Sequence, residues 1–324
     1  MKRLVTSVAA AAAIVCGIVC GVPDAAKAQT WPAKPIRNVM SYAGSTETVI
    51  RLINQKVGDA LGQPVILETQ PGANGSVGVS TVARAAPDGY TVLCANASLV
   101  IRRFLVKDVP WDPFKDLTPI RHIFDSVGVI VAHPQGPTSL KEMIETARQD
   151  PGKLSFGTNG IGSAYHMAAE QVQLLTGVQF LHVPYKASPQ AMTDLIAGRI
   201  QTAFSGHTNT QSFVDAGKAK FLATLNNSRF SLMPNVPTVK ELLPGYQSPP
   251  LWGAYFGPAA LPAPIVQRLQ VEIARAIATP EVRGLMESVG LMPASGGPEE
   301  LAAMMQQDVG QLAKLVKMAG IQPE

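Results

Sequence analysis

The stretch "FGTNGIGSAYHMAAE", residues 156–170, gathers glycines and short polar side chains between a strand-like and a helix-like segment. A helix begins with backbone N–H groups that lack a partner within the helix and with a partial positive charge. Glycine lets a ligand approach such a backbone, and Thr158, Asn159 and Ser163 add short hydrogen-bonding groups. The stretch therefore predicts a site for a carboxylate or a phosphate. A helix cap with a tight turn would use the same residues.

Similar residues recur at four other junctions between a strand-like and a helix-like segment. These junctions are YAGSTE (42–47), QPGANGSVG (70–78), CANAS (94–98) and AFSGHTNT (203–210). A helix cap needs only one short polar side chain. Five junctions of the same chemistry therefore favour a shared ligand site over capping alone.

The common catalytic motifs are incomplete in this chain. Ser76 lies in NGSVG, where the nucleophile elbow G-x-S-x-G would need a glycine in place of Asn74. The segment GIGSA around Ser163 lacks the final glycine of that elbow. The phosphate loop is absent, and GIGSAY fails the dinucleotide pattern at its last position. We therefore expect no enzyme activity and no cofactor, with an α/β hydrolase that uses Ser76 as the enzyme alternative.

The histidines give little support for a metal site. None of the five forms an H-x-x-x-H or H-E-x-x-H pair, so we expect no bound metal. His166 and His207 lie in or just after the polar loops, which makes them candidates for ligand binding. The interpretation of the other three is a core or surface role: His122, His133 and His182.

Strand and helix patterns alternate along the chain and must position these loops. Apolar Val49, Ile50, Ile53 and Val57 at helical spacing predict a helix over residues 45–62. The predicted strands lie at 36–42, 64–69, 90–95, 153–157, 179–185, 200–205, 220–225 and 252–257. The other predicted helices lie at 76–86, 139–150, 163–177, 189–198, 263–278, 280–290 and 298–320. This alternation predicts an α/β fold with largely parallel sheets, and such sheets bind ligands at the carboxyl ends of their strands.

The first 28 residues are typical of a secretory signal peptide. Lys2 and Arg3 precede an apolar stretch, and Ala26-Lys27-Ala28 forms a small-x-small cleavage signal. Cleavage there lowers the formal net charge of +4 by two, which argues against a nucleic-acid partner. Only Cys94 would remain, so no internal disulfide is expected. The remaining length suggests two domains in an exported, monomeric protein.

The order of several segments resembles the Bug-type receptors, the extracytoplasmic solute-binding proteins of tripartite tricarboxylate transporters. The most specific match is LGQPVILETQPGANGSVG followed by ARAAPDGYTVL. VPWDPFKDLTPI, DPGKLSFGTNGIGSAYHMAAE, HVPYKAS, DLIAGRIQTAFS and MPNVPTVKEL follow in the order of that family. The resemblance covers nearly all of the chain after the signal peptide.

This resemblance implies a two-lobed periplasmic-binding-protein fold that closes over an organic acid. Each lobe would be a mostly parallel sheet flanked by helices, and the chain would cross the hinge twice. The implied lobe I is residues 29–128 plus 255–324, and the implied lobe II is residues 129–254. The implied partners are a small organic acid and the membrane subunits of a tripartite transporter, and the implied location is the periplasm.

The polar loops and the resemblance together assign candidate ligand contacts to both lobes. In lobe I these residues are Tyr42, Gly44, Ser45, Thr46, Asn74, Gly75, Ser76, Ser98 and Arg102. In lobe II they are Thr158, Asn159, Ser163, His166, Tyr185, Ser205 and His207.

Three departures from the family pattern bear on the ligand. The first loop, SYAGSTE, is two residues shorter, which would widen the pocket beside Tyr42. Arg102 and Arg103 stand where the family often has Asn-Pro, and Ser205 replaces a common aspartate. These departures favour a mono- or dicarboxylate, with an aromatic acid ahead of citrate, although Tyr42 could equally be a packing residue. A solute-sensing receptor domain of a signalling system would have the same fold and pocket, so that alternative stays open.

Overall fold

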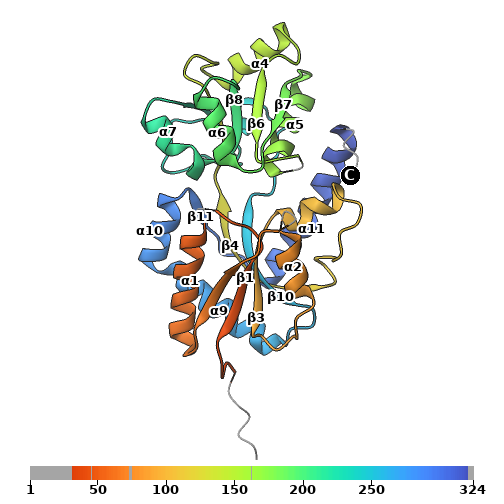
Figure 1. Cartoon of the computed structure of the whole chain (residues 1–324), viewed down its shortest axis with the longest axis vertical. Helices are drawn as coiled ribbons and strands as arrows, with labels where there is room; N and C mark the ends of the chain where they lie inside the picture. Colours follow the sequence, from red (N-terminus) through yellow and green to blue (C-terminus); the bar gives the residue numbers. More distant parts are fainter. Residues whose placement is uncertain (1–30, 45, 73–74, 162, 320–324) are drawn as a thin grey trace, which may run out of the picture.

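The computed structural model describes residues 31–44, 46–72, 75–161 and 163–319. The predicted signal peptide, Ser45 and Asn74 lie outside these ranges. The described chain forms two α/β lobes stacked along the long axis of the molecule (Figure 1). None of the described helices is long and apolar enough to cross a membrane.

Lobe I is built on a six-stranded sheet in the order β11-β4-β10-β3-β1-β2. Its strands are β1 (Ile36–Met40), β2 (Val65–Thr69), β3 (Thr91–Asn96), β4 (Leu117–Ser126), β10 (Trp252–Pro258) and β11 (Leu291–Pro293). Its helices are α1 (Glu47–Leu61), α2 (Ser76–Ala83), α3 (Ser98–Ile101), the 3-10 helix η1 (Arg102–Phe104), α9 (Ala263–Ala278), α10 (Pro280–Ser288) and α11 (Pro298–Ala319). The helices α1, α9 and α10 lie on one side of the sheet, and α2 and α11 lie on the other (Figure 1).

Two apolar clusters hold these layers together. The predicted apolar stripe of α1 is buried and packs with apolar residues of α9 on one face. Gly62 ends α1 with φ of 72°, a left-handed conformation that favours glycine. On the other face, Val79 and Val82 of α2 pack near Leu301 and Met305 of α11. The periodicity of the apolar residues thus places both helix layers as expected.

Lobe II is built on a five-stranded sheet in the order β7-β6-β8-β5-β9. Its strands are β5 (Gly128–Ala132), β6 (Ser155–Thr158), β7 (Leu181–Pro184), β8 (Thr202–Gly206) and β9 (Lys220–Thr224). Its helices are α4 (Leu140–Gln149), α5 (Ala164–Thr176), α6 (Ser188–Ile196), η2 (His207–Asn209), α7 (Gln211–Asp215) and α8 (Val239–Leu242). Apolar residues of α4, α5 and α8 cover one face of the sheet, and residues of α6 and α7 cover the other.

The two-lobed α/β fold is confirmed, and most strands of each sheet run in one direction, although both sheets are mixed. In lobe I, β1 pairs in parallel with β2 and β3, whereas β10 is antiparallel to β3 and β4 and β11 is antiparallel to β4. In lobe II, β6 is parallel to β7 and β8, whereas β5 is antiparallel to β8 and β9. The strands β5 and β10 run against their neighbours because the chain enters each of them from the other lobe.

The connection from β4 to β5 brings one edge of each sheet together. Because β10 is antiparallel to both β3 and β4, β4 ends at Ser126 on the edge where β1 to β3 end. After Val127, β5 begins at Gly128 opposite Gly206, where β8 ends. The carboxyl ends of the parallel strands of both lobes therefore meet at this crossing. In parallel sheets, ligands bind at these ends.

Hydrogen bonds from three other segments surround the crossing. Asn226 donates its side-chain amide to the Ser126 carbonyl and accepts from the Gly128 N–H, each at 3.0 Å. Val127 donates its N–H to the Gly290 carbonyl at 3.0 Å and accepts from the His207 N–H at 2.8 Å. Both backbone groups of Val127 are thus occupied, so the crossing is a constrained point between the lobes.

Candidate ligand-binding site

The second loop of lobe I requires glycine at its end. Gly75 has φ of 93°, and a Cβ atom there would lie 2.7 Å from the carbonyl oxygen of Ser41. This close approach places the first turn of α2 beside the carboxyl end of β1. Ser76 is the first residue of α2. Its hydroxyl is buried and has no hydrogen-bond partner in the part of the chain that the structure describes.

The first loop of lobe I turns its aromatic residue inward. The Tyr42 hydroxyl lies 3.7 Å from the Cys94 thiol, and the ring packs against the α1–α9 cluster. Burial raises the pKa of Tyr42 well above its ordinary value. Tyr42 therefore has the packing role that the sequence left open. Gly44 is exposed with φ of 149°, and Thr46 precedes α1 with its hydroxyl buried and unpaired among the described residues.

Ser98 and Arg102 stand at the two ends of the short helix α3. The Ser98 hydroxyl donates to the side-chain oxygen of Asn96 at 2.6 Å, so it is used in a local turn. The Arg102 Nε is buried and has no partner among the described groups, and burial lowers the pKa of its guanidinium. Of this pair, Arg102 has the unused hydrogen-bonding capacity.

In lobe II, the loop after β6 is organised by Thr158. Its hydroxyl accepts from the Gly160 N–H at 3.2 Å and lies 2.8 Å from Nε2 of His182. Ser163 caps α5, since its hydroxyl accepts from the His166 N–H at 3.2 Å. Asn159 is exposed at the tip. Ser163 therefore caps α5. Ligand binding by this loop is a separate hypothesis.

Two histidines stack beneath this loop. The rings of His166 and His182 lie 4.2 Å apart and nearly parallel, and His182 also stacks on Phe156 at 4.7 Å. Nε2 of His166 is 3.4 Å from a carboxylate oxygen of Glu170. Burial, followed by the charge of His166, lowers the pKa of His182 to about 4. The sequence interpretation gave His182 a core or surface role, but the stack itself was not predictable because only the fold brings β7 beside the loop.

Tyr185 is engaged by a neighbour in lobe II. Its hydroxyl donates to a carboxylate oxygen of Asp194 on α6 at 2.7 Å, and Asp194 also pairs with Arg199. Burial, reinforced by this carboxylate, raises the pKa of Tyr185 to about 12. The hydroxyl is thus held by α6, and the Tyr185 ring lies 3.2 Å from the place where a Cβ atom on Gly157 would be.

Ser205 and His207 lie where β8 reaches the hinge. The Ser205 hydroxyl and Nδ1 of His207 are buried and unpaired within the described ranges. The His207 ring stacks on Phe221 at 6.0 Å and meets Phe230 edge-on at 5.4 Å, and burial lowers its pKa. A Cβ atom on Gly290 of lobe I would lie 2.4 Å from Nδ1 of His207, so this side chain touches both lobes.

Several buried polar atoms without a partner lie at or just after the carboxyl ends of strands in both lobes, and others lie elsewhere in the described chain. Such groups are uncommon in folded proteins and call for an explanation, such as a ligand or an ordered water. Within the described chain, the examples at these ends are Thr69, Ser76, Ser205, His207 and Thr224. Sequence reasoning did not name Thr69 or Thr224 as candidates, although Thr69 ends one predicted strand and Thr224 is the last residue but one of another.

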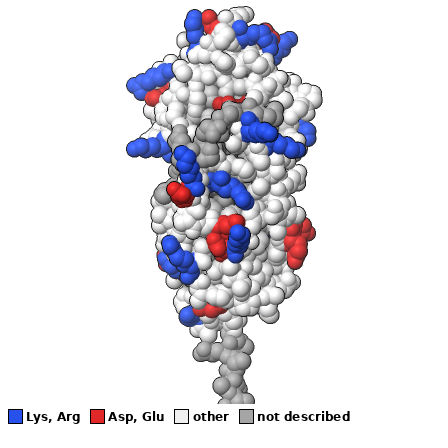
Figure 2. Space-filling model, turned by 90° about the vertical axis from the view of Figure 1, so that its right-hand side faces the viewer, with Lys and Arg blue, Asp and Glu red and all other residues white. Residues whose placement is uncertain are grey.

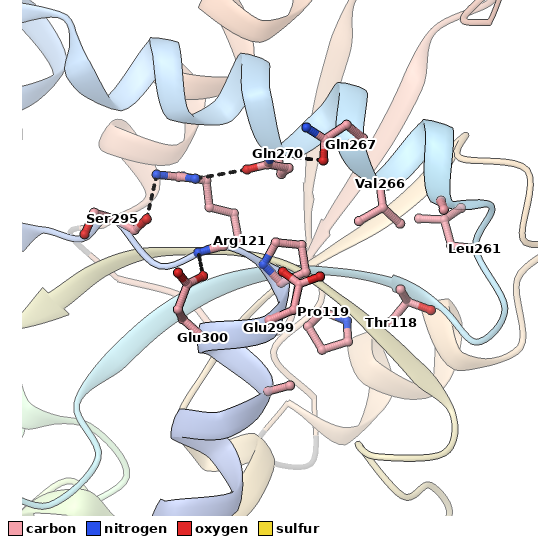
Figure 3. Close-up of a pocket in the computed structure, with 14 residues that line it drawn as sticks. Thr118, Pro119, Arg121, Leu261, Val266, Gln267, Gln270, Ser295, Glu299 and Glu300 are labelled. Carbon is pink, nitrogen blue, oxygen red and sulfur yellow. Dashed lines mark hydrogen bonds between the residues drawn. The ribbon is translucent and has the colours of Figure 1, made fainter.

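A separate cavity lies away from these strand ends. A hollow of about 660 Å³ opens on lobe I between β4, α9 and the start of α11 (Figure 3). Arg121 reaches across it and donates to Gln270 at 3.1 Å and to the Ser295 carbonyl at 3.0 Å. Two nitrogens of its guanidinium are therefore already bonded within the protein, although Nε has no partner among the described residues, and the lining includes none of the predicted ligand contacts. We place the candidate site at the meeting edges of the sheets instead.

Among the described residues, neither the charged side chains on the face in Figure 2 nor the possible metal ligands mark a further site. Figure 2 shows small groups of basic and acidic side chains, separated by uncharged ones, over one face of the molecule. Among the residues that the structure describes, no group of three or more His, Cys, Asp or Glu side chains could hold a metal ion.

Solved structures of similar proteins share this fold. R. palustris Rpa4515, solved with adipate, is 27% identical with a TM-score of 0.82, covering 91% of this chain and 100% of that one. The periplasmic binding protein BugD is 30% identical with a TM-score of 0.78, covering 91% and 100%. MatC from Rhodopseudomonas palustris, solved with malate, is 26% identical with a TM-score of 0.76, covering 88% and 100%.

A family model gives the same relationship over most of the sequence. The model described as the tripartite tricarboxylate transporter family receptor matches residues 49–321. This match confirms the resemblance to Bug-type receptors. The chain therefore belongs to the tripartite tricarboxylate transporter receptor family, whose members are solute-binding proteins and not enzymes.

Proposed function

We propose that this protein is a periplasmic receptor that captures an organic mono- or dicarboxylate between its lobes and delivers it to the membrane subunits of a tripartite transporter. The observation that carries this proposal is the set of buried, unpaired polar groups at the edges that meet at Val127. Adipate in Rpa4515 and malate in MatC support a carboxylate as the ligand class.

The wider organisation belongs to the same proposal. The signal peptide is residues 1–28, and the mature protein acts as a monomer in the periplasm without a cofactor. The proposed lobe limits are residues 29–128 with 255–324 for lobe I and residues 129–254 for lobe II, within three residues of the sheets, since β5 begins at Gly128 and β10 begins at Trp252.

The ligand contacts are proposed to come from both lobes. In lobe I, the start of α2 at Gly75 and Ser76 binds one polar group, with Thr46 and Arg102 nearby in the same lobe. In lobe II, the start of α5 binds the other. Each charge-assisted hydrogen bond contributes about 1.5–3 kcal/mol, and a helix terminus adds roughly 0.3–1 kcal/mol. A ligand that touches both loops favours the closed arrangement, because only closure completes its contacts.

A thermal-shift and titration screen of carboxylic acids tests the proposed function. At a concentration one hundred times Kd, the true ligand should raise the free energy of unfolding by about 2.7 kcal/mol. We expect an aromatic dicarboxylate and adipate to bind more tightly than citrate, because the shortened first loop and Ser205 leave room for a bulkier ligand. Tight binding of citrate alone would refute this ranking, and no response to any acid would refute the function.

Two substitutions at Ser163 separate ligand binding from helix capping. Ser163→Ala removes the cap of α5 and should lower the free energy of unfolding by about 1 kcal/mol. Ser163→Asp keeps a capping oxygen but places a negative charge beside the ligand, so stability should stay near the parent value while Kd for a carboxylate rises at least tenfold. Denaturant unfolding and calorimetric titration on the same samples measure both. If Ser163→Asp binds the acid as well as the parent does, the loop is a cap only.

A further inference from the structure

Two large apolar side chains are exposed beside the proposed ligand loops, one in each lobe. Val77, the second residue of α2, is 49% exposed, and Ile161, in the loop before α5, is 58% exposed. Single exposed apolar residues are ordinary on protein surfaces. The position of these two is what distinguishes them, since each lies within two residues of a glycine with positive φ in a polar loop.

Val77 is held in place by the second loop of lobe I. Its N–H donates to the Gly72 carbonyl at 3.2 Å. A Cβ atom on Gly72 would lie 2.8 Å from a methyl carbon of Val77, so the side chain packs directly against this glycine. Its neighbour Ser76 has the buried, unpaired hydroxyl described above. An apolar and a polar group therefore stand side by side at the start of α2.

Ile161 is placed in a comparable way in lobe II. Gly160, with φ of 121°, donates to the Thr158 hydroxyl, which is itself held by His182. The strands β6 and β8 are parallel, and β8 ends at the hinge opposite Gly128. Ile161 thus lies at the carboxyl edge of the lobe II sheet, and Val77 lies at the corresponding edge of lobe I. These are the edges that the crossing at Val127 brings together.

We infer that Val77 and Ile161 contact the carbon skeleton of the bound carboxylate and select an unsubstituted hydrocarbon skeleton over a hydroxylated one. This inference rests on the proposed function. A ligand whose carboxylates bond to the polar loops places its carbon chain between them. Burial of apolar surface there stabilises the complex by roughly 25 cal/mol per Å², whereas a buried hydroxyl beside these methyl groups would lose its water without gaining a partner.

The test replaces a methyl group of Val77, or the ethyl group of Ile161, by a hydroxyl. Val77→Thr and Ile161→Thr should each weaken adipate binding about fivefold, the effect of burying about 40 Å² less apolar surface. Malate binding should change less than twofold, because the malate hydroxyl can lie beside the introduced threonine hydroxyl. The melting temperature without ligand should stay near the parent value, since both side chains are exposed before closure.

Ile66 and Leu181 provide matched controls. They are 51% and 52% exposed, but they lie near the amino ends of the edge strands β2 and β7, away from the loops. Ile66→Thr and Leu181→Thr should leave both affinities unchanged. If the parent binds adipate and the Val77 and Ile161 variants match these controls, the inference is overturned while the proposed function stands. If the parent binds no carboxylate at all, the proposed function fails first.

Discussion

Replacing Gly75 by valine should abolish carboxylate binding and lower the free energy of unfolding by about 3 kcal/mol. A residue with φ of 93° is strained by about 1–3 kcal/mol when it is not glycine, and a β-branched side chain is strained most. The new Cβ would also lie 2.7 Å from the Ser41 carbonyl oxygen, so the start of α2 must move away from β1. Ser76 and Val77 would move with it, which removes the proposed lobe I contacts.

Gly62→Ala is the control for strain without displacement. Gly62 has φ of 72°, and a Cβ atom there would meet nothing within 4 Å. This variant should cost about 1 kcal/mol of stability and leave affinity unchanged. Denaturant unfolding and calorimetric titration of both variants give the comparison. Parent-like affinity in a folded Gly75→Val protein would place the second loop outside the binding site.

The second large effect is expected at Asp308. At pH 7, Asp308→Asn should raise the free energy of unfolding by about 2 kcal/mol. Burial, followed by the charge of Asp125, raises the pKa of the Asp308 carboxyl to about 6, so keeping it ionised in the folded protein costs stability. Asparagine retains an oxygen that accepts the Trp252 indole N–H, which lies 2.7 Å from the carboxylate in the parent.

The pH dependence has a defined sign. Since the folded pKa is raised, the folded state binds more protons than the unfolded state between about pH 4 and pH 6. The stabilising effect of protonated Asp308 is present below this window and is lost as the pH rises through about 6. The parent and the variant should therefore converge below about pH 4 and differ most above pH 6. A difference that does not change with pH would contradict this assignment.

His182 changes the parent curve in the opposite direction. Its pKa is lowered to about 4, so the unfolded state binds more protons between about pH 4 and pH 6.5, and stability falls as the pH falls through that range. Both His182 and Asp308 therefore contribute to the pH dependence of the parent's free energy of unfolding. Subtracting the curve of Asp308→Asn from that of the parent cancels His182 and isolates the carboxyl.

Strong periodicity made most elements of the fold predictable. The helix α9 begins and ends where its pattern predicts, at Ala263 and Ala278, and its apolar face is buried. The strands β4 and β5 were missed. Residues 117–126 contain Pro119, Arg121 and Asp125 on a strand that pairs on both sides, so neither alternation nor a continuous apolar run marks it. The hinge itself was therefore invisible in the local pattern.

The candidate site was predictable where the backbone demanded a particular residue. The glycine at Gly75 and the cap at Ser163 both stand where the loops predicted them. The inward turn of Tyr42 toward Cys94 depends on β3 lying beside β1, and the stack of His182 on His166 depends on β7 lying beside β6. These contacts join residues far apart in sequence, so local patterns carried no signal for them.

The bonds around Val127 have a mechanical consequence. Asn226 ties together the residues on either side of it, and Gly290 and His207 occupy its own N–H and carbonyl. A joint pinned in this way acts as the fulcrum of a lever. A rotation at the crossing displaces groups that lie to its side, so the proposed binding loops of the two lobes would move relative to each other. In the proposed receptor function, this rotation would let a small ligand change the outline that a membrane partner meets.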